Sequence, residues 1–352
     1  MIASALAVLA LLVPHGTAPP PPLEPTLVAD TFRAVVVTDL DTNGLVVGGP
    51  ELVAYRPLST ASGGIPVIES GGTRAEVPTG DYTGYVVQQR FAALPDAYSI
   101  VDVLPSTAFV LGRARGGKAP LARTTLKGRP ALHASYPLGP NACAGIRGGR
   151  GELWLDPATL LPLRQVEVRG RQVRRTTVRY QDVGAPIPAS AFAIPSLPGE
   201  TPDQDDGFRR TSPAEAAAHL SYTPLLPASV EPGFALAVTG WAPRSPRNGP
   251  EGANPRHREL FAAVYRRGHE RIDVTMRLAR GAGSFPNDPF GSECGFQFEE
   301  RATVRGLAAR YATGPGLVPH LTWRDGPVLL TVSGPLPKRA LVAIAASLAP
   351  AS

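Results

Sequence analysis

Histidine, cysteine and acidic side chains are the groups that most often perform catalysis or hold metals, and in this chain they are scattered. The histidines are His15, His133, His219, His257, His269 and His320. Each lacks a partner at the spacing of a metal site or a catalytic triad. The one His-Glu pair, His269-Glu270, falls at the tip of an expected hairpin rather than on a helix as a zinc protease requires. We therefore expect no catalytic residue, no metal and no cofactor.

The two cysteines, Cys143 and Cys294, also lack neighbours at zinc-ligand spacing. In an exported chain, two cysteines suggest one disulfide, which here would join two different domains. Two buried free thiols are the alternative, and the residues do not decide between them.

The stretch "GELWLDPATLLPLRQVEVR" offers Asp156 as a candidate acid beside Trp154. Asp followed by Pro also starts tight turns, because Asp caps the turn and Pro fixes its φ angle. We interpret Trp154, Asp156 and Pro162 as parts of a structural β-hairpin. Trp323 and Asp325 predict an analogous hairpin near the C-terminus.

Composition indicates a globular protein that binds no nucleic acid. Hydrophobic residues make up 43% and charged residues 18%, while 39 prolines and 37 glycines favour short strands and turns. The net charge is +6, carried by 32 arginines and three lysines against 29 acids. The excess is spread along the chain rather than clustered, unlike a nucleic-acid interface. A mild attraction to an anionic envelope surface is consistent with this charge.

The N-terminus reads as an export signal. Residues 2–13 are apolar, too short to span a bilayer but of the length of a signal-peptide core. We expect residues 1–18 to be a signal peptide or an uncleaved signal anchor, and residues 19–25 to be a proline-rich spacer. The protein would then be extracytoplasmic: periplasmic, in the cell envelope or secreted. Cleavage of the segment is left open.

Residues 26–198 predict a mainly β domain. Eight runs of four to ten residues, rich in Val, Thr, Tyr and Phe, end at Gly, Pro or Asp. One of these expected strands is "TAFVLGRA", and no helix is expected between Val101 and Gly151. So many short strands favour one curved antiparallel sheet.

Residues 199–211 predict an acidic, proline-containing linker, and residues 212–352 a small α+β domain. Ser212-Pro213-Ala214-Glu215 is a capping box that starts a short helix. In the run 271–278, apolar and polar residues alternate, which predicts a strand with one buried and one exposed face. Leu341, Ile344, Ala345 and Leu348 predict one buried stripe on a C-terminal helix.

The segments "LWLDPATLLPLRQVEVRG" and "TVRYQDVGAPIPASAFAIP" resemble the last third of the domain found in LolA-type lipoprotein carriers. The same domain type forms the first part of RseB-like (MucB-like) regulators of anti-sigma factors. "LTWRDGPVLLTVSGPLPKRALVAIAASL" resembles the C-terminal half of those regulators. Two such domains behind an export signal are the RseB-like arrangement.

This resemblance implies a curved antiparallel half-barrel around helices, with an apolar cavity for acyl chains and no catalysis. The residues that we expect to line the cavity share two strand faces: Tyr85, Val87 and Phe91 on one, and Phe109 and Leu111 on the other. Ordinary two-layer core packing explains the same patterns equally well.

Three functions are left as hypotheses. The first is a non-enzymatic extracytoplasmic protein that binds lipid or lipoprotein acyl chains and regulates an envelope-stress partner, such as a membrane-bound anti-sigma factor. The second is a purely protein-binding envelope regulator without a lipid cavity. The third is a hydrolase whose site is assembled only in space. The identity of the ligand, the protein partner and the oligomeric state do not follow from the sequence.

Overall fold

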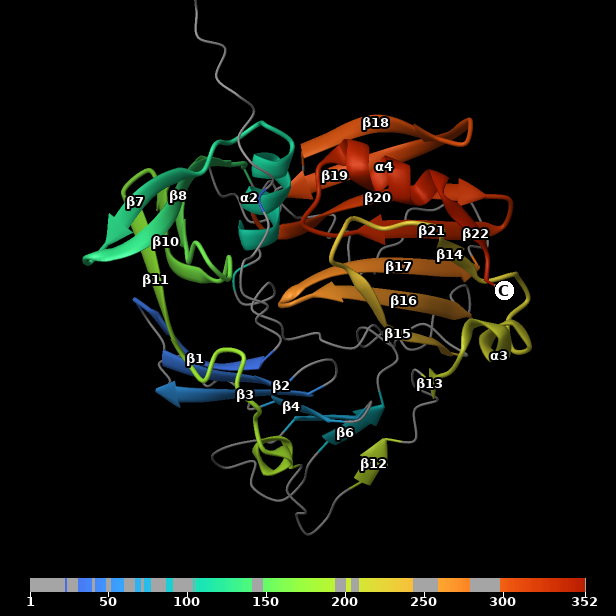
Figure 1. Ribbon diagram of the computed structural model, residues 1–352, viewed down its shortest axis with the longest axis horizontal. Coiled ribbons are helices and arrows are strands. Elements are labelled where there is room, and N and C mark those ends of the chain that lie inside the picture. The colour runs from blue at the N-terminus through green and yellow to red at the C-terminus, as the bar shows by residue number, and fades with distance from the viewer. Residues whose placement is uncertain are drawn as a thin grey trace, which may run out of the picture.

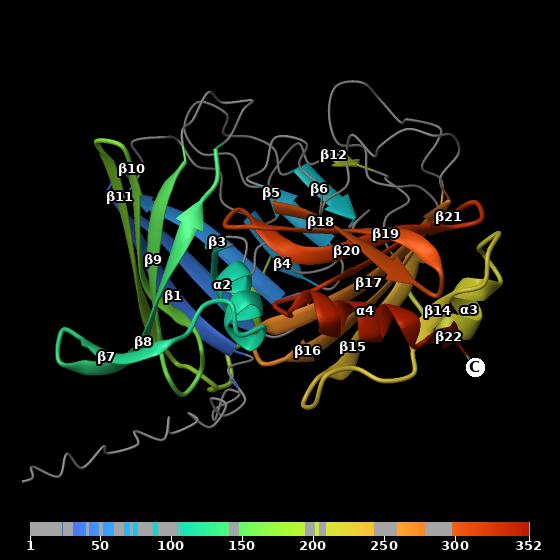
Figure 2. The same cartoon turned by 90° about the horizontal axis from the view of Figure 1, so that it is seen from above.

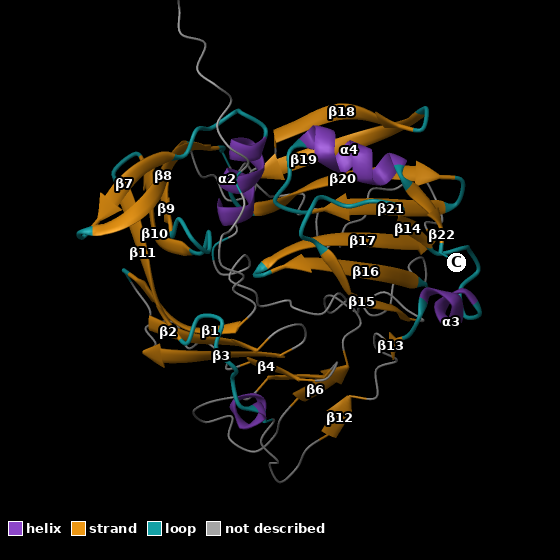
Figure 3. Ribbon diagram, viewed as in Figure 1, coloured by secondary structure: helices purple, strands orange, loops and turns teal. Residues whose placement is uncertain are grey.

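The computed structural model shows a mainly β protein built on two large sheets (Figures 1 and 3). The structure describes residues 23, 31–39, 42–48, 52–59, 67–70, 73–76, 87–90, 104, 106–140, 148–193, 201–203, 209–242, 259–278 and 298–351. Among these residues, no helix is long and apolar enough to cross a bilayer.

The first sheet has twelve strands in the order β12-β6-β5-β4-β3-β2-β1-β11-β10-β9-β8-β7. Their bounds are β1 (Thr31–Thr38), β2 (Thr42–Gly48), β3 (Leu52–Ser59), β4 (Val67–Ser70), β5 (Thr73–Glu76), β6 (Val87–Arg90), β7 (Ala122–Leu126), β8 (Arg129–Leu138), β9 (Gly149–Leu155), β10 (Pro162–Arg169), β11 (Gln172–Gln181) and β12 (Thr201–Asp203). All neighbours are antiparallel except β12 and β6. The strands at the two ends, β12 and β7, do not pair with each other, so the sheet is not closed into a barrel.

The sheet curves around one helix, α2 (Ser106–Arg115). Strands β7–β11 form one wall and β1–β6 a second, with α2 in the angle between them (Figures 1 and 2). The predicted curved, mainly β half-barrel is thereby confirmed.

The predicted strand "TAFVLGRA" is wrong, because residues 106–115 form α2, and so is the expectation of no helix between Val101 and Gly151. The first seven residues of α2 are all buried, from Ser106 to Gly112. A helix buried on every side carries no apolar stripe, so its sequence lacks the helical period and resembles a strand. Tertiary contacts have overridden the weak local preference.

The two faces of the first sheet are covered differently. On the α2 face, Phe32 and Val36 of β1 pack against Ala108 of the helix. On the opposite face, Ala54 and Ile68 pack against Phe192 of η2 (Ala189–Phe192). We call these the α2 face and the η2 face.

The second sheet has eight strands in the order β13-β15-β16-β17-β21-β20-β19-β18. Their bounds are β13 (Arg209–Arg210), β15 (Ala235–Ala242), β16 (Leu260–Arg267), β17 (Glu270–Leu278), β18 (Phe298–Val304), β19 (Leu307–Gly314), β20 (Leu317–Asp325) and β21 (Val328–Ser333). Strand β14 (Leu225–Pro227) pairs separately with β22 (Leu348–Pro350).

Two helices accompany this sheet, α3 (Pro213–Ala217) and α4 (Lys338–Ala346). Ser212 and Glu215 form the capping box of α3: the Ser212 hydroxyl accepts from the Glu215 amide at 3.2 Å, and the Glu215 carboxylate accepts from the Ser212 amide at 2.8 Å. Helix α4 buries Leu341, Ile344 and Ala345 against one face of the sheet. The predicted sheet-plus-helices second domain is confirmed as to class.

The expectation of one exposed face along β17 is wrong. Ile272, Val274 and Met276 lie in the core as expected, but Asp273, Thr275 and Arg277 on the other face are also buried. Alternation assigns residues to faces but does not say whether the polar face meets water. Pairing offsets part of the cost of this burial. Arg271 Nε lies 3.1 Å from an Asp273 carboxylate oxygen, which also accepts from Ser333, whereas the Thr275 hydroxyl has no hydrogen-bond partner among the described residues.

The first sheet takes its last strand at Asp203 and the second its first at Arg209, so strands enter the segment expected to be a linker. The domain bounds at 26–198, 199–211 and 212–352 stay predictions. The segment 1–18, Cys143 and Cys294 lie outside the described residues, as do Tyr85 and Phe91. The disulfide and the signal peptide therefore also stay predictions.

Candidate functional site

The residues predicted to line a cavity fall into two groups. Phe109 and Leu111 lie on α2 and are buried, 0% and 1% exposed, in a cluster with Leu153 and Leu155 of β9. They fill the angle of the half-barrel rather than line open space there. Val87 lies on β6, where it pairs with Glu76.

The hairpin between β9 and β10 is built as a tight structural turn. Asp156 Oδ1 accepts hydrogen bonds from the amides of Ala158 and Thr159, each at 2.9 Å, and from the Thr159 hydroxyl at 3.0 Å. Tyr180 donates to the carbonyl of Pro162 at 2.9 Å and ties the hairpin to β11. With three donors held by one oxygen, Asp156 is occupied in the turn.

Trp154 lies on the η2 face of this hairpin, where it contacts one cationic side chain and one aromatic ring. The guanidinium of Arg164 stands 5.2 Å from the centre of its ring, and the His133 ring is 4.7 Å away. The second tryptophan hairpin turns at Gly326, φ +56°, between Asp325 and Val328. Trp323 is 4% exposed in the core of the second sheet.

A polar network crosses the α2 face behind the helix. Gln165 donates to the Tyr136 hydroxyl at 2.7 Å and to Glu167 at 2.8 Å. Burial, together with the Glu167 carboxylate, raises the pKa of Tyr136 far above its ordinary value. Gly151 leaves room for this ring, because a Cβ at Gly151 would lie 2.1 Å from the ring of Tyr136. The network holds the wall of the half-barrel in shape.

Helix α2 continues from the first sheet onto the second. A Cβ at Gly112 would lie 3.0 Å from the carbonyl oxygen of Leu336 and 3.2 Å from Pro319, and one at Gly116 would lie 3.1 Å from Pro337. Such close approach of two backbones is what glycine permits. The same helix therefore packs against both sheets.

The C-terminal end of α2 is held by a buried ion pair. Arg115 donates to both carboxylate oxygens of Glu270, at 2.6 and 3.1 Å, and to the carbonyl of Pro335 at 2.8 Å. Arg267 donates to Glu270 at 3.1 Å from the other side. The side chain of Glu270 is 1% exposed and that of Arg115 is 10% exposed. We call Arg115, Arg267 and Glu270 the buried clamp.

Electrostatics favours the ionised form of the clamp. Burial alone would raise the pKa of Glu270, but Arg115, then His269 and Arg267, hold it below its ordinary value. Arg115 also donates to the carbonyl of Leu23, at 3.1 and 3.3 Å, so the clamp also holds the backbone at this residue. At the surface, Lys118 reaches Glu300 of β18 at 3.4 Å and adds a weaker link between the sheets.

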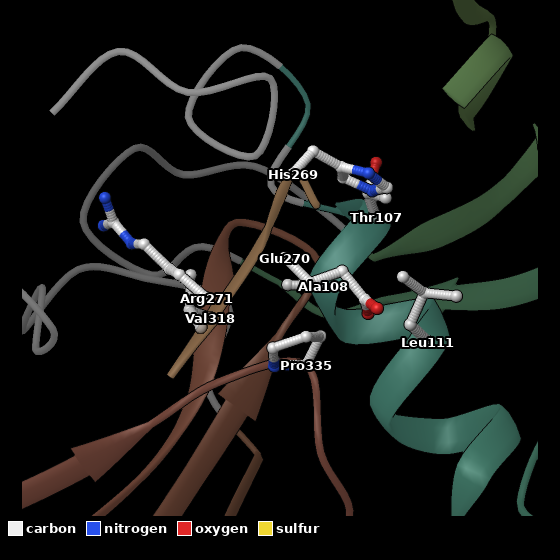
Figure 4. A pocket seen from close by; sticks show the side chains of 8 residues that line it. All are labelled: Thr107, Ala108, Leu111, His269, Glu270, Arg271, Val318 and Pro335. Carbon is white, nitrogen blue, oxygen red and sulfur yellow. The ribbon is translucent and has the colours of Figure 1, made fainter. Parts of the chain in front are cut away.

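His269 is the neighbour of the clamp at the hairpin tip (Figure 4). It is 5% exposed, and its Nε2 atom has no hydrogen-bond partner among the residues described. Burial lowers the pKa of His269 to about 4, with Arg266, Arg115 and Arg267 acting in the same direction and Glu270 opposing them. The imidazole is therefore neutral at neutral pH.

The crevice beside His269 and Glu270 is small. Thr107, Ala108 and Leu111 of α2 form one side, and the two hairpin residues form the other (Figure 4). Its free volume fits about one water molecule. A substrate has no room beside this His-Glu pair, and the carboxylate is already bound by two guanidinium groups. Within the described part of the chain, no three His, Cys, Asp or Glu side chains converge as a metal site. The buried clamp and the residues around this crevice therefore fix α2 on the second sheet.

Sequence reasoning missed the clamp. Arg115 and Glu270 are 155 positions apart, and a charged residue at a hairpin tip is ordinarily solvated. Burial of Ser106 to Gly112 is known only from the structure, so no sequence signal indicated that Arg115 ends a buried helix.

No protein-family model matches this sequence, and no curated protein matches it either. Among solved structures, MucB and MucB in complex with MucA(peri) are each 15% identical and cover 92% of this chain and 94% of their own. The TM-scores are 0.31 and 0.28 respectively. Scores this low do not establish a common fold, so membership of the RseB-like family stays a prediction.

Glu270→Gln is expected to lower the free energy of unfolding by about 3–5 kcal/mol, because it leaves two guanidinium groups buried without a countercharge. Denaturant unfolding of the variant measures the loss. Asp325→Asn, which neutralises an acid at an exposed hairpin tip, is the matched control and should unfold like the wild type. Replacing Arg115 and Glu270 together by Met should cost less than the two single changes added, and strict additivity would argue against the clamp.

The buried neutral His269 predicts a loss of stability in acid. The unfolded chain takes up a proton near pH 6.5, whereas the folded protein does so only near pH 4. Lowering the pH through this window therefore favours unfolding, by about 2 kcal/mol at pH 5. Glu270 adds to the loss only below its own ordinary pKa, because its folded-state pKa is depressed. Urea unfolding at pH 7 and pH 5 should show a smaller difference for His269→Gln than for the wild type, and equal differences would contradict the assignment.

Proposed function

We propose that this chain is a non-enzymatic, extracytoplasmic binding protein whose ligand is an acyl chain of a lipid or lipoprotein. The apolar run of residues 2–13 supports export, and the sequence resemblance to LolA-type and RseB-like domains supports an apolar ligand. The proposed organisation is a first domain over residues 26–198, a linker over 199–211 and a second domain over 212–352.

The observation that carries the proposal is the α2 face of the first sheet. Strand register leads from Ala34 through Leu45, Tyr55, Val67 and Glu76 to Val87. Directly paired residues lie on the same face of a sheet, so position 87 falls on the face that α2 occupies.

The described contacts of the helix with this face include residues of β1, β8 and β9. Ala108 packs on β1, and Phe109 and Leu111 pack toward β8 and β9. In β2 to β6 the residues in register with Ala34 are mostly apolar: Leu45, Tyr55, Val67 and Val87, with Glu76 as the exception. We propose that an acyl chain covers this part of the face, since burial of apolar surface contributes roughly 25 cal/mol per Å².

A second function is favoured by the part of the angle that is already filled. Because Phe109 and Leu111 are core residues, the volume beside β8 and β9 is closed to a ligand. This packing suits a purely protein-binding envelope regulator, with a membrane-bound anti-sigma factor as the class of partner suggested by the sequence resemblance.

A test of acyl binding uses two neighbouring positions of β6. Val87→Asp adds a charge on the α2 face and should weaken uptake of a fluorescent fatty acid at least about tenfold, because an unpaired charge against apolar surface is costly. Gln88→Asp is the matched control. Its position is in register with Ala75, Ile68 and Ala54, on the face covered by η2. Fluorescence titration of each variant measures the effect. The comparison uses variants whose melting temperature equals that of the wild type.

If wild-type protein binds no fatty acid at any concentration, the acyl-chain proposal fails and the protein-binding regulator takes its place. Equal weakening by both substitutions would likewise exclude position 87 from the ligand site.

Export is tested separately with a reporter enzyme fused after Ser352. A reporter that is active only outside the cytoplasm should be active in this fusion, because the apolar run would direct the following chain across the membrane. Activity of a cytoplasm-specific reporter at the same position would contradict export, whatever the ligand.

A further inference from the structure

The hairpin that joins β10 to β11 has a narrow, exposed tip. Arg169 pairs with Gln172, which leaves a two-residue turn of Gly170 and Arg171. Gly170 has φ +59°, the conformation that such tight turns require at their first position. In Figures 1 and 2 the hairpin lies on the side of the first sheet that is remote from the second sheet.

Positive charge is concentrated at this tip. The basic residues on it and on the adjoining strand are Arg150, Arg169, Arg171, Arg174 and Arg175. All residues from 171 to 175 are exposed. Among the residues described, Arg171, Arg174 and Arg175 form no ion pair.

The acids near the tip lie farther from its end. Glu152 sits 3.4 Å from Arg150, and Glu167 accepts a hydrogen bond from Gln165. Glu167 is opposite Arg174 in the ladder, so one of the tip arginines has an acid close by. The carboxylate of Asp39 accepts a hydrogen bond from the backbone amide of Arg175 at 2.8 Å. Five basic groups against these three acids still leave the tip with a net positive charge.

An apolar side chain stands in the middle of these arginines. Val173 is 40% exposed. Among the described residues, Leu236 is the one other large hydrophobic residue with similar exposure. Val173 belongs to none of the core clusters of described residues, and part of its side chain meets solvent at the end of a basic hairpin.

We propose that the β10–β11 tip contacts an anionic lipid surface. Arginines bind phosphate groups with two parallel hydrogen bonds, and each basic residue near an anionic leaflet contributes about 1 kcal/mol. Val173 would enter the apolar boundary between the headgroups while the arginines stay among the phosphates.

An acidic protein partner fits this tip less well. A stable protein interface covers about 800 Å² on each partner, far more than a tip a few residues wide presents. Membrane contact needs no such area, because the charges act on many equivalent headgroups. The inference rests on export only for its cellular setting, and it is independent of acyl binding on the α2 face.

The test measures binding of the full chain to sedimented vesicles of phosphatidylcholine alone or mixed with phosphatidylglycerol. Binding should require the anionic lipid and should be abolished in high salt, because salt screens exposed charges. Comparing the two vesicle types removes any contribution of the N-terminal apolar run, which does not depend on headgroup charge. Acyl uptake by the same preparation, measured in parallel, separates this inference from the proposed ligand site.

Arg171→Glu/Arg174→Glu should weaken binding to anionic vesicles at least about tenfold. Arg301→Glu/Arg339→Glu makes the same change of net charge at exposed positions of the second domain and should leave binding near the wild-type value. Arg171→Gln/Arg174→Gln should show an intermediate loss, and unchanged melting temperatures establish that all variants fold. Equal binding to both vesicle types by the wild type, or equal loss in the tip and control variants, would overturn the proposal. Tip-dependent binding of polyglutamate without vesicle binding would overturn it in favour of an acidic protein partner.

Discussion

The arrangement of the two sheets depends on one buried carboxylate. Glu270, 1% exposed, is bound by Arg115 from the first domain and by Arg267 from its own hairpin. Bringing three charges out of water is costly, and the cost is offset only where the geometry satisfies them, as the bidentate contact at 2.6 and 3.1 Å does here. The guanidinium of Arg267 also stands over the ring of Phe234 at 4.5 Å, which fixes it in turn. Because breaking one member leaves the others buried and uncompensated, the clamp has few alternative arrangements, and the position of α2 on the second sheet follows from it.

Helix α2 connects the buried clamp to the core of the first sheet. Its middle, at Phe109 and Leu111, fills the angle of the half-barrel, while Gly112 and Arg115 lie against the second sheet. The helix is thus a shared core element of both domains and not a lid over one of them. Independent motion of the two sheets would require the helix to leave one of its two packing surfaces.

Local signals predicted much of this fold. Alternation, turn residues and the capping box at Ser212 correctly indicated a mainly β chain with a helix-covered second sheet, because each depends on residues close in sequence. The signals failed where burial is decided at long range. "TAFVLGRA" carries no helical period because both of its sides are covered, and the polar face of β17 is buried because Arg271 and Asp273 pair there. The clamp joins positions 155 apart, and no local pattern reports such a pairing. The lining residues Tyr85 and Phe91 lie outside the described residues, so that part of the predicted site is still a prediction.

The clamp also limits where an apolar ligand can bind. A ligand that entered the angle beside β8 and β9 would have to displace Phe109 and Leu111, and moving α2 would pull Arg115 from a carboxylate that cannot be left alone in the interior. Binding energy from a single acyl chain would then be consumed in separating buried charges. A ligand on the α2 face of β2 to β6, the site proposed above, would not have to displace Phe109 or Leu111 from their cluster. Under the acyl-binding proposal, the buried ion pair would therefore favour a ligand on the half of the curved sheet formed by β1 to β6.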